Sequence, residues 1–290
     1  MGDNKAYEIE KLSSGQPEYP AALKEIRDYP KELYYIGDFS ILNRSCAAVV
    51  GARKTTQYGR NIASAIGKRL GAAGVTVVSG MAQGIDTCAH RGALDRGGAT
   101  AAVLGCGLDL CYPPGNRQLK QEIQEKGLVL SEYPPGTQPR RYHFPQRNRI
   151  ISGLSELTIV VQAGNCSGSL ITADLAAEQG RDVYAVPGNI DSEYHLGSNK
   201  LIQEGATPLI CVEDVLRHFR TKPVLHEEIK SRLSDTEQEV YGLLLKHGEL
   251  SADELCLYLQ KPPAYINRIV VVMEMKGFVS SALGKYFAAG

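Results

Sequence analysis

"AAVVGARKTTQYGR", residues 47–60, joins a short apolar run to a tight turn at Gly51 and to the start of a polar, helical segment. Six similar runs follow, each ending in glycine or a turn, at residues 75–79, 99–104, 128–131, 157–162, 182–186 and 207–211. The segments between them can hold a crossover helix, so the pattern predicts a βαβ series. Continuous apolar strands are typical of a parallel sheet covered by helices on both faces. The predicted fold class is therefore α/β, with a Rossmann-like, doubly wound and mostly parallel sheet.

Two turns after predicted strands suit a phosphate group. Ligands of doubly wound sheets collect at the carboxyl ends of the strands, where amides and helix N-termini face outward. Gly51 permits the first turn, and Arg53 stands where a helix begins and can grip an anion, although it could instead pair with a carboxylate. The second turn follows the run at 157–162 and offers backbone and hydroxyl donors from Ser167, Gly168, Ser169 and Thr172. Its small residues could also serve only to pack a helix on the sheet.

Composition and charge exclude several classes of protein. The 32 Lys and Arg balance 32 Asp and Glu, so only a local cluster of charge can indicate a partner. Seven cysteines without a Cys-x-x-Cys pair favour reduced thiols over a zinc module. The N-terminus has no apolar core for export, and no stretch approaches the roughly 20 apolar residues that cross a bilayer. We expect a cytoplasmic protein that needs no metal or cofactor and contacts no membrane.

Signatures of common catalytic sites are missing from the sequence. No Gly-x-x-x-x-Gly-Lys-Ser/Thr motif and no recognisable nucleophile elbow occur, and the six His are scattered. Asp109 and Glu132 stand at predicted strand ends, where lone carboxylates more often cap or brace loops than act as bases. Asp86 is expected to cap a helix. The sequence therefore predicts a protein that is not an enzyme.

"RRYHFPQRNRIISGLS", residues 140–155, lies in a segment without acids between Glu132 and Glu156. It places aromatic rings of Tyr142 and Phe144 among Arg140, Arg141, Arg147 and Arg149. Single-stranded nucleic acid needs cations for its phosphates and flat rings for its unstacked bases. Neutralising about four phosphates would give a salt slope of roughly −3. The alternative is structural, with Phe144 in the core and some arginines, Arg149 above all, bracing the sheet.

The domain organisation follows from changes in pattern. Residues 1–44 are a lead-in that packs on the core, and residues 45–220 form the Rossmann-like domain. Residues 221–232 are charged and lack apolar periodicity, so they are expected to be a linker. Residues 233–290 then show three helical segments and a hairpin with Gly284 in its turn, which indicates a winged-helix domain. Few cations occur on its third helix, so a dimerisation or protein-contact role is the alternative to DNA binding.

Eight motifs in one order resemble the DNA-processing protein A (DprA/Smf) family: "VGAR", "SGMAQGID", "GCGLDLCYPPGN", "SEYPPGTQP", "FPQRNRIISGLS", "SGSLITA", "GRDVYAVPGN" and "GSNKLIQEGA". The resemblance covers about residues 19–216, and the C-terminal segment is similar to the family's winged-helix appendage. It implies an extended Rossmann fold that binds single-stranded DNA as a homodimer and loads the RecA recombinase during natural transformation. The DNA-binding residues that the resemblance implies are Arg53, Arg141, Phe144, Arg147 and Arg149, and Asn148 of the same motif is counted with them.

Two other functions are compatible with parts of the sequence. The turn in "SGSLITA" resembles the phosphate turn of lysine-decarboxylase-like Rossmann enzymes, which suggests a nucleotide- or sugar-phosphate-processing enzyme, although the Pro-Gly-Gly-x-Gly-Thr turn of those enzymes is missing. The C-terminal domain could instead be the main DNA reader, with a preference for duplex.

Overall fold

The computed structural model describes residues 8–95, 97–219, 233–282 and 284–288, and divides the chain into two compact units, 1–221 and 222–290. The strands of the first unit are β1 (Glu10–Ser13), β2 (Glu32–Gly37), β3 (Cys46–Val50), β4 (Thr76–Ser79), β5 (Thr100–Leu104), β6 (Leu128–Ser131), β7 (Leu157–Val160), β8 (Asp182–Ala185) and β9 (Thr207–Pro208). Its α-helices are α1 (Ala21–Lys24), α2 (Gln57–Ala72), α3 (Ile85–Asp95), α4 (Arg117–Lys126), α5 (His143–Gly153), α6 (Gly168–Glu178), α7 (Leu196–Gln203) and α8 (Asp214–His218).

These strands form one sheet in the order β1-β2-β6-β5-β4-β3-β7-β8-β9. All neighbours from β6 to β9 pair in parallel, whereas β2 pairs antiparallel with β6, and β1 with β2. The chain builds outward from β3 in one direction through β4, β5 and β6, and then returns to the other side of β3 with β7. The doubly wound, mostly parallel α/β fold is confirmed, and its switch point lies between β3 and β7.

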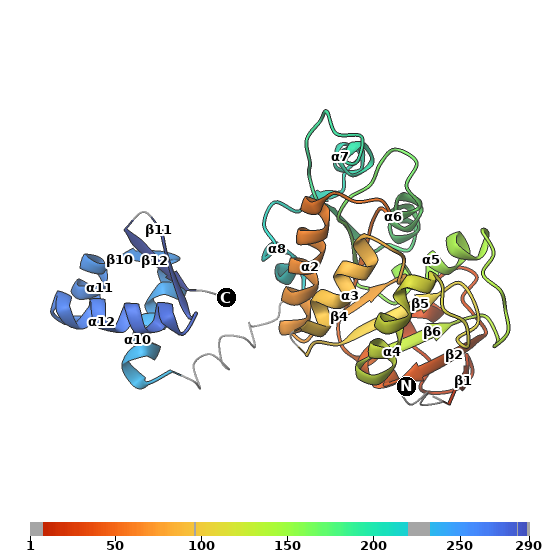
Figure 1. The fold of residues 1–290 in the computed structure, drawn as a ribbon, viewed down its shortest axis with the longest axis horizontal. Coiled ribbons are helices and arrows are strands. Elements are labelled where there is room, and N and C mark those ends of the chain that lie inside the picture. The colour runs from red at the N-terminus through yellow and green to blue at the C-terminus, as the bar shows by residue number, and fades with distance from the viewer. Residues whose placement is uncertain (1–7, 96, 220–232, 283, 289–290) are drawn as a thin grey trace. The chain divides into compact units, whose positions relative to one another are not determined.

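Helices cover both faces of the sheet (Figure 1). On one face, Ile66 of α2 and Ile85 of α3 pack against Val49 and Val77 of the central strands. On the other face, helices α5 and α6 pack together with α1 in a second core. The central strands are buried along their whole length, as the continuous apolar runs require.

The lead-in contributes two strands and part of the core. Strand β2 extends the sheet beyond β6 at residues that the sequence did not mark as a strand. Leu23 and Ile26, from α1 and the turn after it, are buried against the same core as Ile150 of α5. The segment that precedes β3 is therefore an integral part of the first unit.

The second unit has its own hydrophobic core. It consists of α10 (Asp235–His247), β10 (Glu249–Ser251), α11 (Ala252–Leu259), α12 (Pro263–Met275), β11 (Val279–Ala282) and β12 (Lys285–Ala288). Its three strands form an antiparallel sheet in the order β10-β12-β11. Its designation as a winged helix stays a prediction, and the expected linker at 221–232 lies outside the described residues.

Candidate nucleic-acid interface

The topology fixes the position of a large cleft in the first unit. In a doubly wound sheet the loops after the two strands at the switch point separate, and ligands bind between them. Here the loop after β3 carries Gly51 and Arg53, and the loop after β7 ends at Ser167, which is followed by Ser169 in the first turn of α6. Both loops line one cleft of about 1000 Å³, and the N-terminal half of α5 lines it as well. The cleft therefore lies where the sequence predicts ligand binding.

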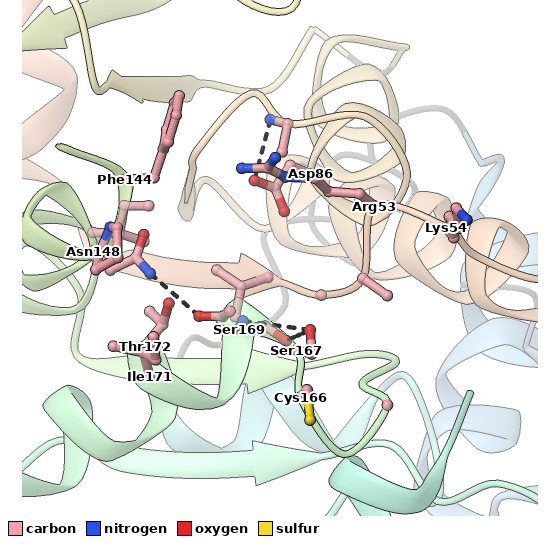
Figure 2. Close-up of a pocket in the computed structure, with 18 of the residues that line it drawn as sticks. Arg53, Lys54, Asp86, Phe144, Asn148, Cys166, Ser167, Ser169, Ile171 and Thr172 are labelled. Atoms are coloured by element: carbon pink, nitrogen blue, oxygen red, sulfur yellow. Dashed lines mark hydrogen bonds between the residues drawn. The ribbon is translucent and has the colours of Figure 1, made fainter. Parts of the chain in front are cut away.

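Arg53 and Phe144 meet in this cleft. The guanidinium of Arg53 lies 5.3 Å from the centroid of the Phe144 ring, within the range of a cation–π contact. Tyr112 also packs near this ring, with its ring centroid 5.3 Å from that of Phe144. Figure 2 shows Arg53 extending toward Phe144, while Lys54 lies on the far side of the cleft. An exposed cation and two rings are thus arranged as a single surface.

Glycine makes this arrangement possible at Gly51. A Cβ at this position would lie 2.6 Å from Cγ1 of Ile85 and 2.9 Å from the backbone oxygen of Gln162, so no larger residue fits without a shift. The Phe144 ring similarly rests over Gly105, where a Cβ would lie 3.1 Å from the ring. Close backbone approach at these two turns positions the loop before Arg53 and the ring of Phe144.

Arg147 forms part of the cleft floor and is held by the protein backbone. It is only 5% exposed, and its guanidinium donates hydrogen bonds to the carbonyl oxygens of Gly80 and Val103. Burial lowers the pKa of Arg147 to about 10, which leaves it charged at neutral pH. The sequence predicts Arg147 as a ligand-binding residue. In the structure it also has a structural role, because it joins the backbone at Gly80 to the backbone at Val103.

Asp86 lies beside Arg147 and also faces the cleft. Its carboxylate accepts hydrogen bonds from the amides of Gly80 and Ala82, 3.2 and 3.3 Å away. Burial raises the pKa of Asp86, while the Arg147 guanidinium and the two amides oppose this shift. Both donor amides belong to the turn before α3, so the Asp86 carboxylate stabilises that turn. The helix-capping role that the sequence suggests for Asp86 is therefore wrong.

The serine turn provides donors at the start of α6. Ser167 is the N-cap residue, and its hydroxyl accepts a hydrogen bond from the amide of Ser169. Asn148 of α5 donates to the backbone oxygen of Gly168 at 3.3 Å, which ties α5 to this turn (Figure 2). The side chains of Ser169 and Thr172 are buried at the same edge of the cleft. The N-terminus of α6 therefore opens into the cleft, with its amides facing any bound anion.

The two remaining arginines of the predicted site, Arg141 and Arg149, have different environments. Arg141 is exposed and lines the cleft, whereas Arg149 does not. The Arg149 guanidinium instead forms a two-point contact with Glu132, at 2.6 and 3.2 Å, and both side chains are mostly buried. Ten of the eleven residues that the sequence predicts for DNA or phosphate binding thus line one cleft, namely Gly51, Arg53, Arg141, Phe144, Arg147, Asn148, Ser167, Gly168, Ser169 and Thr172. The Arg149–Glu132 pair braces α5 against the end of β6.

The charge of the cleft is positive. Four cations, Arg53, Lys54, Arg141 and Arg147, line it with two acids, Asp86 and Glu193, which gives a formal charge of +2. Lys54 and Tyr112 were not selected from the sequence. Lys54 could have been found as the cation next to Arg53, whereas only the fold brings Tyr112 to Phe144.

Within the described residues, no cluster of three His, Cys, Asp or Glu suits a metal ion, and no helix is long and apolar enough to cross a membrane.

Most of the first unit matches a known protein family. The family model described as DNA recombination-mediator protein A matches residues 10–220. The chain belongs to this family. The recombination-mediator relatives include the DNA processing protein DprA of Streptococcus pneumoniae, which is 47% identical over 201 residues, covering 69% of this chain and 71% of that protein. DprA of Bacillus subtilis is 41% identical over 221 residues, covering 76% and 74% of the two chains.

Solved structures of the recombination-mediator family have the same fold. The X-ray structure of DprA from Streptococcus pneumoniae matches with a TM-score of 0.70 and 44% identity, covering 72% of this chain and 74% of that one. A structure of DNA processing protein A from Helicobacter pylori, which addresses the single-stranded DNA binding mode of that protein, matches with a TM-score of 0.68 and 31% identity. It covers 73% of this chain and 96% of the other. The family that the sequence resembles is therefore confirmed.

Proposed function

We propose that this chain binds single-stranded DNA in the cleft and acts as a non-enzymatic recombination mediator. The observation that carries the proposal is the arrangement of Arg53, Arg141 and Phe144 around one cleft, with the N-terminus of α6 at its edge. Exposed guanidinium groups bind phosphates, and a partly exposed ring such as that of Phe144 can stack on an unpaired base. A duplex offers no free base face to the Phe144 ring, so the cleft favours single strands.

The experiment is a titration of fluorescently labelled oligothymidine at several salt concentrations, read by anisotropy. Replacing both Arg53 and Arg141 by Ala should weaken binding at least tenfold, because a charge-assisted contact contributes roughly 1.5 to 3 kcal/mol. Three exposed cations line the cleft, so we expect a salt slope of about −2, at roughly −0.7 per phosphate contacted. This is shallower than the slope of −3 expected from the sequence, because only Arg141 of the four arginines at 140–149 is an exposed cation of the cleft, where Arg53 and Lys54 join it.

Arg140→Ala is the matched control. Arg140 is adjacent to Arg141, is exposed and donates to the Tyr142 hydroxyl, but it does not line the cleft. We expect the Arg140→Ala variant to bind oligothymidine with nearly the affinity of the unaltered protein. Equal losses for Arg140→Ala and Arg141→Ala would mean that only diffuse charge matters, and unchanged binding in the double variant would refute the proposal.

We further propose that the protein acts as a homodimer, loads RecA onto single-stranded DNA and works in the cytoplasm. The description of the family as recombination mediators supports a role next to a recombinase. The expected results are a dimer mass in light scattering and faster RecA-dependent ATP hydrolysis on DNA coated with single-strand-binding protein. A monomer, or a RecA lag that the protein does not shorten, would contradict these two parts of the proposal separately.

A further inference from the structure

A second group of large side chains lines the cleft, from helix α6 and from the segment that leads into α7. Ile171, Tyr194 and Leu196, here called the apolar wall, are 40%, 38% and 45% exposed. Ile171 belongs to the "SGSLITA" motif, whereas Tyr194 and Leu196 lie outside the motifs quoted above. Large apolar groups that gather on an exposed surface usually mark a contact site. The wall shares the cleft with Arg53 and Phe144, so a ligand long enough to cross the cleft would reach both.

The segment that carries Tyr194 and Leu196 is held firmly by the residue between them. His195 is 4% exposed, and its Nε2 accepts a hydrogen bond from the side-chain amide of Gln162 at 2.8 Å. Tyr194 and Leu196, on either side of the buried His195, are exposed. The Tyr194 ring is therefore presented by a fixed backbone, which reduces the entropy lost when it binds a ligand.

Gln162 also holds the loop of Arg53. Its side-chain oxygen accepts hydrogen bonds from the Thr55 hydroxyl at 2.5 Å and from the Thr56 amide at 2.9 Å. One buried amide at the end of β7 thus connects the cationic loop after β3 with the segment of the apolar wall. The backbone adds to this rigidity, because the Gly197 amide donates to the oxygen of Ala163 at 2.8 Å.

We propose that the apolar wall is a second platform for nucleobases, with Tyr194 stacking on a base several nucleotides from the one at Phe144. This inference rests on the proposed function. Charge sets the direction of the strand across the cleft: Glu193, exposed next to Tyr194, repels phosphates, whereas Arg53 and Arg141 attract them. The phosphates therefore run along the arginines, away from Glu193, and bases project toward Tyr194.

Replacing Tyr194 by Ala should weaken the binding of a 20-nucleotide oligothymidine about 5- to 150-fold, the range for the loss of one stacked base. Tyr194→Phe keeps the ring and should bind normally. The salt slope should not change in either variant, because no phosphate contact is lost. Tyr265→Ala is the matched control, since Tyr265 is 40% exposed but lies in the second unit. Normal binding by Tyr194→Ala would overturn the inference.

A direct measurement is available because the chain contains no Trp. Tyr194→Trp would place the only indole of the protein at the wall, and a stacked base should quench its fluorescence at the oligonucleotide concentration where anisotropy saturates. Unchanged emission at saturation would count against the platform. The experiments distinguish failure of the proposed function from failure of this inference. If the cleft does not bind DNA, Phe144→Ala and the arginine variants bind oligothymidine with unchanged affinity. If only the inference about the apolar wall is wrong, those variants bind more weakly and Tyr194→Ala binds normally.

Discussion

His90 is a fully buried residue whose protonation state is fixed by its neighbours. The Thr100 hydroxyl donates to the backbone oxygen of Val77, so it must accept the Nδ1–H of His90 at 2.7 Å. Nε2 of His90 is buried and has no hydrogen-bond partner. A proton added there would find no acceptor and would lie near the charge of Arg147, so burial lowers the pKa of His90 to about 3.

This shift predicts that stability falls in weak acid. Between pH 6.5 and about 3 the unfolded chain binds a proton at His90 that the folded chain does not, so the free energy of unfolding decreases as pH falls through this window. At pH 5 the loss from this residue should be about 2 kcal/mol relative to pH 7. Urea unfolding at both pH values checks it. The decrease should be smaller in His90→Asn, and an equal decrease would show that His90 is not responsible.

Arg147 gives a second prediction at this scale. Its replacement by Met should lower the free energy of unfolding by about 2 to 4 kcal/mol, because the buried oxygens of Gly80 and Val103 lose their donor. Adding Asp86→Asn should recover part of the loss, since it removes the buried charge left next to the vacated guanidinium. Chemical denaturation of both single variants and the double variant tests this coupling. If the losses of the two single variants simply add in the double variant, Arg147 and Asp86 are not coupled and the prediction is wrong.

The three arginines at 141, 147 and 149 mark the limit of prediction from sequence at the residue scale. Their common charge and their place among aromatic residues predict a basic site, and the cleft does collect Arg141 and Arg147. Their separate environments depend on groups far away in sequence, the carbonyl oxygens of residues 80 and 103 and the carboxylate of Glu132. No local pattern shows these partners.

Helix α5 explains the same difference at the scale of an element. His143, Arg147, Ile150 and Ile151 are buried on one side of it, at the i, i+4, i+7 and i+8 spacing of a helix face. This periodicity was available in the sequence, and it would have placed Arg147 on the inner face. The strands of the α/β series were predicted within a few residues, because continuous apolar runs are unambiguous there. Strand β2, with two buried residues among partly buried and exposed ones, carries a weaker signal.

The serine turn before α6 allows its structural and binding roles to be separated. Ser167→Ala removes the N-cap and should cost about 1 kcal/mol of stability. Ser167→Asp keeps an N-cap acceptor but adds a negative charge at the edge of the cleft, so it should fold normally and bind oligothymidine poorly. Denaturation and anisotropy on both variants are the measurements. Normal binding by the aspartate variant would mean that phosphates do not approach this turn.

At the scale of the whole molecule, the described residues of the second unit differ in charge from the lining of the cleft. Residues 233–288 contain five Lys and Arg and seven Asp and Glu, a net charge of −2, against +2 for the lining of the cleft. The exposed face of α12, the helix that would enter a DNA groove if this unit is a winged helix, carries Tyr265, Val271, Val272 and Met275 with Arg268 as its cation. Such a face is poorly suited to phosphates, which supports the protein-contact alternative for this unit.

Removal of residues 222–290 should therefore leave single-strand binding nearly unchanged. The first unit keeps its complete sheet, its two helical layers and every residue that lines the cleft, and the second unit has a separate core, so the truncated chain should fold. We expect the dissociation constant for oligothymidine to change less than threefold and the salt slope to stay near −2, because the second unit contributes no cleft cation. A cooperative unfolding transition verifies that the truncated protein is folded. A folded truncation that binds tenfold more weakly, or that loses duplex binding present in the full chain, would assign the DNA contact to the second unit.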